Sequence, residues 1–139
     1  TNTVVELGQH EDSNRNGNDA VMYAWSEIPG YSRFGQYKGT GAAGNFVYTG
    51  FRVKYLLTKC KTASSGWLCN DAVRDTNGSN GNDATIETSH HAAEYTSGGL
   101  QVFLVSNGFH INSATQNTSG ETYIYAAFAE HPFKTARAR

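Results

Sequence analysis

The sequence predicts an all-β domain, an antiparallel β-sandwich, and three observations lead to this class. Helical periodicity of apolar residues is nearly absent, and short apolar or alternating runs recur instead between clusters of Gly, Asn, Asp and Ser. The 139 residues include 15 Gly but only 2 Pro, which fits many short strands joined by turns. The 8 Tyr, 7 Phe and 2 Trp supply enough large apolar side chains to fill one core.

Eight or nine strands are expected, and ten segments have suitable residue types. They are 3–8, 20–27, 31–38, 46–49, 52–60, 67–73, 84–88, 100–105, 109–112 and 122–130. The clearest local feature is Ser106-Asn107-Gly108 between two apolar runs, because Asn-Gly supplies the positive φ angles of a tight hairpin turn. A second hairpin is expected to join residues 52–60 to 67–73 through the loop 62–66.

Two of these segments, residues 20–25 and 123–129, are apolar on both faces, which is typical of central strands. When residues 119–133 are placed over residues 16–30, Gly, Ala, Glu and Pro coincide at Gly17 and Gly120, Ala24 and Ala127, Glu27 and Glu130, and Pro29 and Pro132. The match predicts that residues 1–30 are an N-terminal strand segment resembling the closing strand of a preceding repeat. Residues 31–139 would then form one complete sandwich.

The charge pattern argues against two classes of partner. The formal net charge is -1, and the basic residues cluster only at Lys134, Arg137 and Arg139, whereas a nucleic-acid binder needs a concentrated basic face. No stretch approaches the roughly 20 apolar residues of a transmembrane helix. We therefore expect neither nucleic-acid binding nor membrane insertion.

Five segments follow one another in an order that is typical of a known domain. They are residues 30–39, 50–59, 67–75, 103–109 and 120–133. Together they resemble a domain common in bacteriophage tail-fibre and virion structural proteins, of the concanavalin A-like or laminin-G-like (LamG-like) jelly-roll type. The chain departs from the pattern at Val53, where the family usually has Pro, and in the Asn-rich and Asp-rich loop after Arg74.

The resemblance implies a phage virion structural protein, in which residues 31–139 are a LamG-like, C-terminal tail-fibre-type domain that attaches to a host-surface glycan or protein. It implies a homo-oligomer, usually a trimer, that contacts other virion proteins and is assembled in the bacterial host cytoplasm. An alternative is an architectural capsid decoration, head-fibre or shaft module with no receptor. A weaker alternative is a bacterial extracellular lectin.

Polar loops and aromatic rings are the candidate ligand contacts, since loops on a sandwich carry binding and flat rings stack on sugars. The expected contact loops are residues 12–19, 75–83 and 114–120. The candidate ligand-binding residues are Asn14, Asn16, Tyr31, Tyr37, Asn77, Asn80, Asn82 and Asn117. Core positions are expected for the remaining aromatic residues of interest, Trp25, Phe34, Tyr48 and Trp67.

A calcium site is a minority hypothesis. Asp12, Asn14 and Asn16 place oxygen ligands at alternate positions, as in the first half of a calcium loop, but the twelfth position holds Tyr23 instead of Glu. An ordinary polar hairpin loop is the favoured interpretation. No other cofactor is expected.

Enzymatic activity is not expected, because no strand carries a pair of carboxylates on one face and no nucleophile elbow is present. His90, His91 and Glu94 lack specific metal-site spacing. Cys60 and Cys69 flank the second hairpin loop and would close a short disulfide ring if they were cross-strand neighbours. Free thiols are slightly favoured, since the reducing bacterial cytoplasm is the expected site of assembly.

Overall fold

The computed structural model describes residues 4–8, 10–11, 13–74, 81–82, 84–96 and 101–131, with residues 81–82 described by their backbone. These residues contain strands and turns but no helix, so they include no helix long and apolar enough to cross a membrane. The strands are β1 (Ser32–Lys38), β2 (Asn45–Tyr48), β3 (Val53–Cys60), β4 (Leu68–Asp71), β5 (Gly81–Asn82), β6 (Thr85–Glu87), β7 (Val102–Val105), β8 (Gly108–Ile111) and β9 (Thr122–Ala129).

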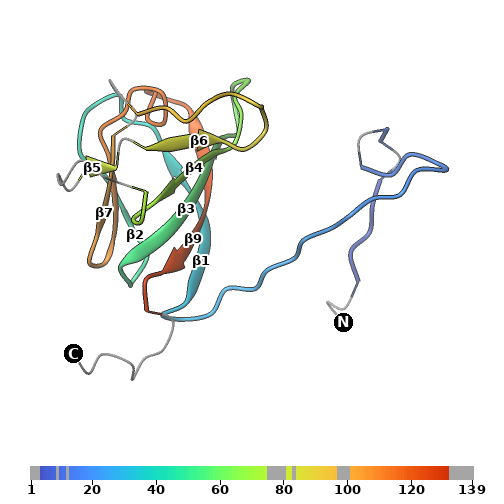
Figure 1. The fold of residues 1–139 in the computed structure, drawn as a ribbon, viewed down its shortest axis with the longest axis horizontal. Helices are drawn as coiled ribbons and strands as arrows, with labels where there is room; N and C mark the ends of the chain where they lie inside the picture. Colours follow the sequence, from blue (N-terminus) through green and yellow to red (C-terminus); the bar gives the residue numbers. More distant parts are fainter. Residues whose placement is uncertain are drawn as a thin grey trace.

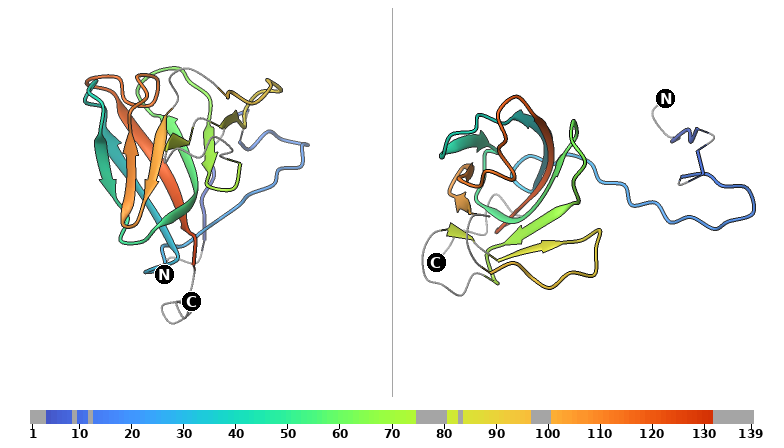
Figure 2. Two further views of the ribbon diagram at one scale, coloured as in Figure 1. Left: turned by 60° about the vertical axis from the view of Figure 1, so that its left-hand side comes forward. Right: turned by 90° about the horizontal axis from the view of Figure 1, so that it is seen from above.

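The strands form two antiparallel sheets that pack face to face (Figures 1 and 2). One sheet has the order β1-β9-β3-β4-β6, and the other has the order β2-β8-β7-β5. The predicted antiparallel β-sandwich is therefore confirmed. Eight of the ten predicted segments contain a strand, and β5, which has only two residues, was not predicted.

The core lies between the sheets and follows the alternation of each strand. On β9, Tyr123, Tyr125 and Ala127 face inward and are buried, while Ile124 and Phe128 face the outer side and are half-buried. β9, an interior strand of the five-stranded sheet, is therefore apolar on both sides, as the sequence predicted. Buried residues from both sheets complete the core: Tyr37, Val47, Phe51, Val53, Leu56, Cys60, Val102, Phe109 and Ile111.

The predicted strands at residues 3–8 and 20–27 are wrong for the residues that the structure describes. Residues 4–8 and 20–27 form no strand and are exposed. Apart from Trp25, whose ring centroid lies 6.4 Å from that of Phe128, the segment runs away from the sandwich (Figure 1). Trp25, expected in the core, is 61% exposed. Residues 20–25 are apolar, as the prediction required, but no strand of the described residues lies beside them to pair with.

The hairpin between β7 and β8 is confirmed, although its turn differs from the prediction. Val105 pairs with Gly108, so Ser106 and Asn107 form a two-residue loop. Every described residue with a positive φ is a glycine, and Gly108 is not among them. Gly108 is needed for space instead, because a Cβ there would lie 2.1 Å from the carbonyl oxygen of Val47 on the neighbouring strand.

The two cysteines are free and buried, and they are not cross-strand neighbours. Cys69 lies opposite Leu57, three residues from Cys60 on the same strand. Because side chains alternate along a strand, Cys60 points into the core while Cys69 lies on the outer face of the sheet. This geometry excludes a disulfide between them and agrees with the favoured free thiols.

Candidate functional site

A pocket of about 450 Å³ lies where β3 ends, β4 begins and β9 begins. The loop between β8 and β9 forms one side, and the loop between β3 and β4 forms another. It borders residues 114–120, one of the three contact loops expected from the sequence. The lining residues are Thr58, Lys59, Cys60, Ser65, Gly66, Leu68, Glu87, Tyr95, Thr115, Gln116 and Tyr123.

Gln116 joins this pocket to a buried polar network on the inner face of the five-stranded sheet. Its Nε2 donates to Thr58 Oγ1 at 2.9 Å and to Asn70 Oδ1 at 3.3 Å, and Asn70 Nδ2 donates to Thr85 Oγ1 at 2.7 Å. The Oε1 atom of Gln116 is buried and has no hydrogen-bond partner among the described residues. A buried acceptor without a donor costs free energy, and because Gln116 is only 1% exposed, a ligand in the pocket meets this atom only after a side-chain rearrangement.

Sequence reasoning missed Gln116, Thr58 and Asn70. A signal was present, because Thr58 and Asn70 occupy inward positions on strands whose other inward residues are mostly apolar. Polar side chains at such positions indicate a buried network or a site.

The loop that carries Gln116 is held by two stacked tyrosines, Tyr37 and Tyr123, whose ring centroids are 5.0 Å apart. Tyr37 Oη donates to the Gln116 carbonyl at 2.8 Å, and Tyr123 Oη donates to the Thr115 carbonyl at 3.1 Å. Burial raises the pKa of Tyr37, so its hydroxyl remains a donor across the physiological range. The pocket wall is therefore preorganised by the core.

Asn117 and Tyr37, both predicted ligand contacts, are buried and serve the fold instead. Asn117 Oδ1 accepts from the Thr40 amide at 2.8 Å and from Asn45 Nδ2 at 2.7 Å, while its own Nδ2 donates to the Ala42 carbonyl at 2.7 Å. These bonds fasten the β8–β9 loop to the β1–β2 loop. Burial leaves neither Asn117 nor Tyr37 accessible to a ligand.

Charged groups at the rim of the pocket are paired. Lys59 Nζ donates to the Ser65 carbonyl at 2.6 Å and lies 5.9 Å from the centroid of the Trp67 ring. Glu87 Oε1 lies 2.7 Å from His90 Nδ1. Because the lining holds one cationic side chain, Lys59, and one acidic side chain, Glu87, the pocket suits a neutral polar ligand better than a strongly charged one.

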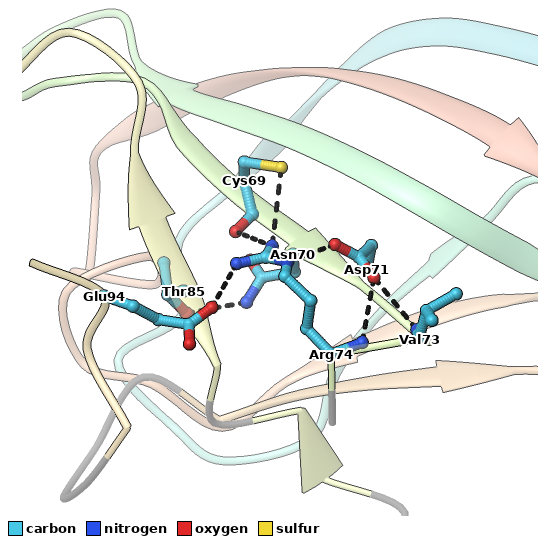
Figure 3. Close-up of polar contacts among 7 residues, drawn as sticks. All are labelled: Cys69, Asn70, Asp71, Val73, Arg74, Thr85 and Glu94. Carbon is cyan, nitrogen blue, oxygen red and sulfur yellow. Dashed lines mark hydrogen bonds and ion pairs between the residues drawn. The ribbon is translucent and has the colours of Figure 1, made fainter. Parts of the chain in front are cut away.

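A second polar cluster fixes the chain just before the predicted contact loop 75–83 (Figure 3). Arg74 forms ion pairs with Asp71 and with Glu94, and its Nη2 donates to the Cys69 carbonyl at 3.3 Å. Asp71 Oδ1 also accepts from the amides of Val73 at 2.9 Å and Arg74 at 3.0 Å. The cluster therefore anchors the turn from which that loop departs.

The ionisation of this cluster follows from its bonds. Burial alone would raise the pKa of Asp71, but hydrogen bonds from the Arg74 side chain and from the Val73 and Arg74 amides outweigh burial and lower it. Burial raises the pKa of the neighbouring Cys69 thiol, and it raises the pKa of Tyr55 to about 12. Cys69 is thus a buried thiol rather than an activated nucleophile.

The lowered pKa of Asp71 makes stability depend on pH. The stabilisation is fully present above the ordinary Asp pKa of about 4 and is lost as the pH falls through the lower pKa of the folded state. Thermal melts of the wild type and Asp71→Asn are expected to differ most at neutral pH and to converge in strong acid. A difference in Tm that stays constant down to about pH 2 would contradict this.

Phe128 is the centre of an aromatic cluster on the outer face of the five-stranded sheet. Phe34, Tyr55 and the predicted ligand contact Tyr31 lie 5.9, 6.0 and 6.3 Å from it between ring centroids. Tyr31 is exposed, and Phe34 is half-buried. Trp67 is half-buried rather than fully in the core, and Tyr48, also expected in the core, is 56% exposed with the Arg33 guanidinium 5.6 Å from its ring centroid.

The structure does not bring the other predicted residues together. Asn14 and Asn16 are exposed on the N-terminal segment, away from the pocket, in a shallow hollow with His10, Glu11 and Arg15. Asp12, Asn77 and Asn80 lie outside the described residues, and Asn82 is described only as backbone of β5. Among the described residues, no group of three or more His, Cys, Asp or Glu is placed to hold a metal ion.

Comparison with known proteins gives one match. A family model described as a domain of unknown function, DUF7483, matches residues 1–132. No curated protein and no solved structure matches the chain.

Proposed function

For this chain, which belongs to the DUF7483 family of domains of unknown function, we propose the role of a phage virion structural domain that attaches to the host surface. In this proposal a tail-fibre-type sandwich of the concanavalin A-like jelly-roll class binds a glycan or a glycan-bearing protein. Copies in a homo-oligomer, a trimer in the simplest fibre, convert weak contacts into avidity.

The observation that supports this proposal is the pocket beside Gln116. It combines apolar walls with the exposed polar side chains of Ser65 and Thr115 and with one charged side chain of each sign, Lys59 and Glu87, which suits a neutral ligand rich in hydroxyls. Its loop is fastened by Tyr37, Tyr123 and Asn117, so little ordering is needed on binding. The sequence resemblance to virion proteins supplies the setting, a particle assembled in the bacterial cytoplasm.

Glycan-array binding by the full chain, displayed in several copies, tests the proposal. Thr115 lines the pocket and is exposed, whereas the adjacent Ala114 is exposed but does not line it. Thr115→Trp is expected to abolish binding, and Ala114→Trp is expected to preserve it. Binding should also survive EDTA, because the proposed contacts use no metal. Equal binding by the two variants, or no glycan bound at all, would refute the pocket as the receptor site.

The exposed apolar N-terminal segment favours a second candidate, an architectural virion module that docks onto other virion proteins and binds no receptor. Val21 and Tyr23 are 79% and 76% exposed, and such side chains usually meet a protein partner. Imaging the chain on an assembled particle distinguishes the two functions. A pocket exposed at a distal tip supports attachment, and a pocket covered by capsid or shaft proteins supports the architectural module.

A further inference from the structure

The N-terminal arm, defined here as residues 15–29, combines an apolar sequence with a lack of strand partners. Its residues 20–27 form no strand and are exposed. Near its end the arm meets the sandwich through a bridge between Ile28 and Ser32 and through the Trp25 ring, whose centroid lies 6.4 Å from that of Phe128. Exposing such a run to water is costly unless a partner covers it. We therefore expect the arm to bind a protein partner, and its turn geometry and side-chain pattern indicate which kind.

The arm begins with the same turn that precedes β9. The Asn18 amide donates to the Arg15 carbonyl at 3.2 Å, and the Glu121 amide, 103 positions later, donates to the Thr118 carbonyl at 3.2 Å. Each turn holds a glycine at the equivalent place with nearly the same left-handed φ, 81° at Gly17 and 84° at Gly120. The two turns therefore match in backbone geometry as well as in sequence.

The side chains that follow also match the two faces of β9. Ala127 is fully buried, and Ala24 occupies the equivalent place in the arm. Phe128, on the outer face, corresponds to Trp25. Glu130, which pairs with Arg52 at 2.9 Å, corresponds to Glu27.

We infer that residues 18–27 are a β9-type strand that completes the five-stranded sheet of a second β-sandwich of this same fold. The β9 place in the arm's own sandwich is filled, because β9 already pairs with β1 on one side and β3 on the other. The acceptor is therefore a sandwich whose own β9 place is open, and the arm joins it by β-strand addition.

The arm also specifies the core of its acceptor. Ala20 and Met22 fall where β9 carries the inward residues Tyr123 and Tyr125, so the arm supplies less volume. Since protein interiors are close-packed, the acceptor carries larger side chains opposite those two places. The partner is a sandwich of the same fold with a different core, and this distinguishes it from an identical copy.

Grafting the arm into the full chain tests whether it is a β9-type strand. The graft replaces residues 120–130 by residues 17–27 but keeps Tyr123 and Tyr125, since this core needs their volume. It is expected to retain a cooperative thermal transition. A matched control exchanges the grafted Ala at 127 and Trp at 128, which turns the indole into the core, and it is expected to lose the transition. Identical behaviour of graft and control, folded or unfolded, would overturn the inference.

A tandem chain tests addition to another sandwich. Ser119 of a first copy continues directly into Gly17 of a second copy, with Ala20→Tyr and Met22→Tyr in the joining arm. Hydrogen exchange of the arm amides at residues 21–26 is expected to slow by about 100-fold or more relative to the wild-type chain. Adding Ala24→Trp should return the exchange to the wild-type rate. Arm amides that exchange at the wild-type rate without that substitution would overturn the inference, whatever the outcome of glycan binding.

Discussion

Replacing Phe109 with alanine is expected to remove a large part of the free energy of unfolding. The ring is fully buried on β8 and lies edge-to-face against Tyr125 at 5.4 Å and Tyr37 at 6.1 Å, both of which belong to the opposite sheet. Truncation of a buried Phe costs about 3–5 kcal/mol, a large part of the roughly 5–15 kcal/mol that stabilises a domain. Urea denaturation followed by circular dichroism measures the loss.

Phe46→Ala is the matched control. Phe46 lies on β2, the strand beside β8, but it is 42% exposed and points away from the core, where it contacts His110. Its truncation is expected to cost about 1 kcal/mol or less. Similar losses at Phe46 and Phe109 would mean that the inter-sheet core does not dominate stability.

Replacing Asn117 with alanine is expected to cost about 2–3 kcal/mol, because three part-buried hydrogen bonds between the two loops are lost together. The Thr40 amide and the Ala42 carbonyl both depend on the Asn117 side chain. The β8–β9 loop would loosen, and the pocket wall formed by Gln116 would loosen with it. Thermal denaturation measures the loss of stability, and glycan binding would weaken as a secondary effect.

Asn112→Ala provides the comparison, since Asn112 is exposed and its side chain accepts one bond, from the Gly44 amide at 2.7 Å. We expect a loss of about 1 kcal/mol or less. An Asn117→Ala variant that is as stable as the wild type but no longer binds glycan would restore Asn117 as a ligand contact, as the sequence suggested.

Strand positions could be predicted from the sequence because alternation and turn residues act locally. Residues 52–60 alternate and residues 123–129 are apolar on both faces, and both segments form long strands, β3 and β9. The same pattern failed at residues 20–27, because an apolar run indicates that a segment needs partners but does not say whether its own domain provides them. The positive φ angles expected at Asn107-Gly108 are also absent. A glycine is required at position 108 because the Val47 carbonyl of the neighbouring strand leaves no space for a Cβ atom.

The candidate site was harder to predict, because accessibility depends on how distant loops meet. Asn117 looks like a solvated loop residue until the β1–β2 loop closes over it, 77 positions away from Thr40. Tyr37 likewise looks exposed among glycines until it stacks on Tyr123. The unpaired Gln116 acceptor arises only where two strands, β3 and β4, bring Thr58 and Asn70 against the β8–β9 loop.

The position of β9 has a consequence for synthesis. It is the last strand of the described chain, yet it lies inside its sheet, between β1 and β3. While the chain emerges from the ribosome, those two strands have no shared neighbour, and their facing edges stay open until residues 122–129 are made. Sheet closure is therefore the final event of folding, and a ribosome that stalls before this point releases a chain with two unpaired edges, prone to capture any compatible strand nearby.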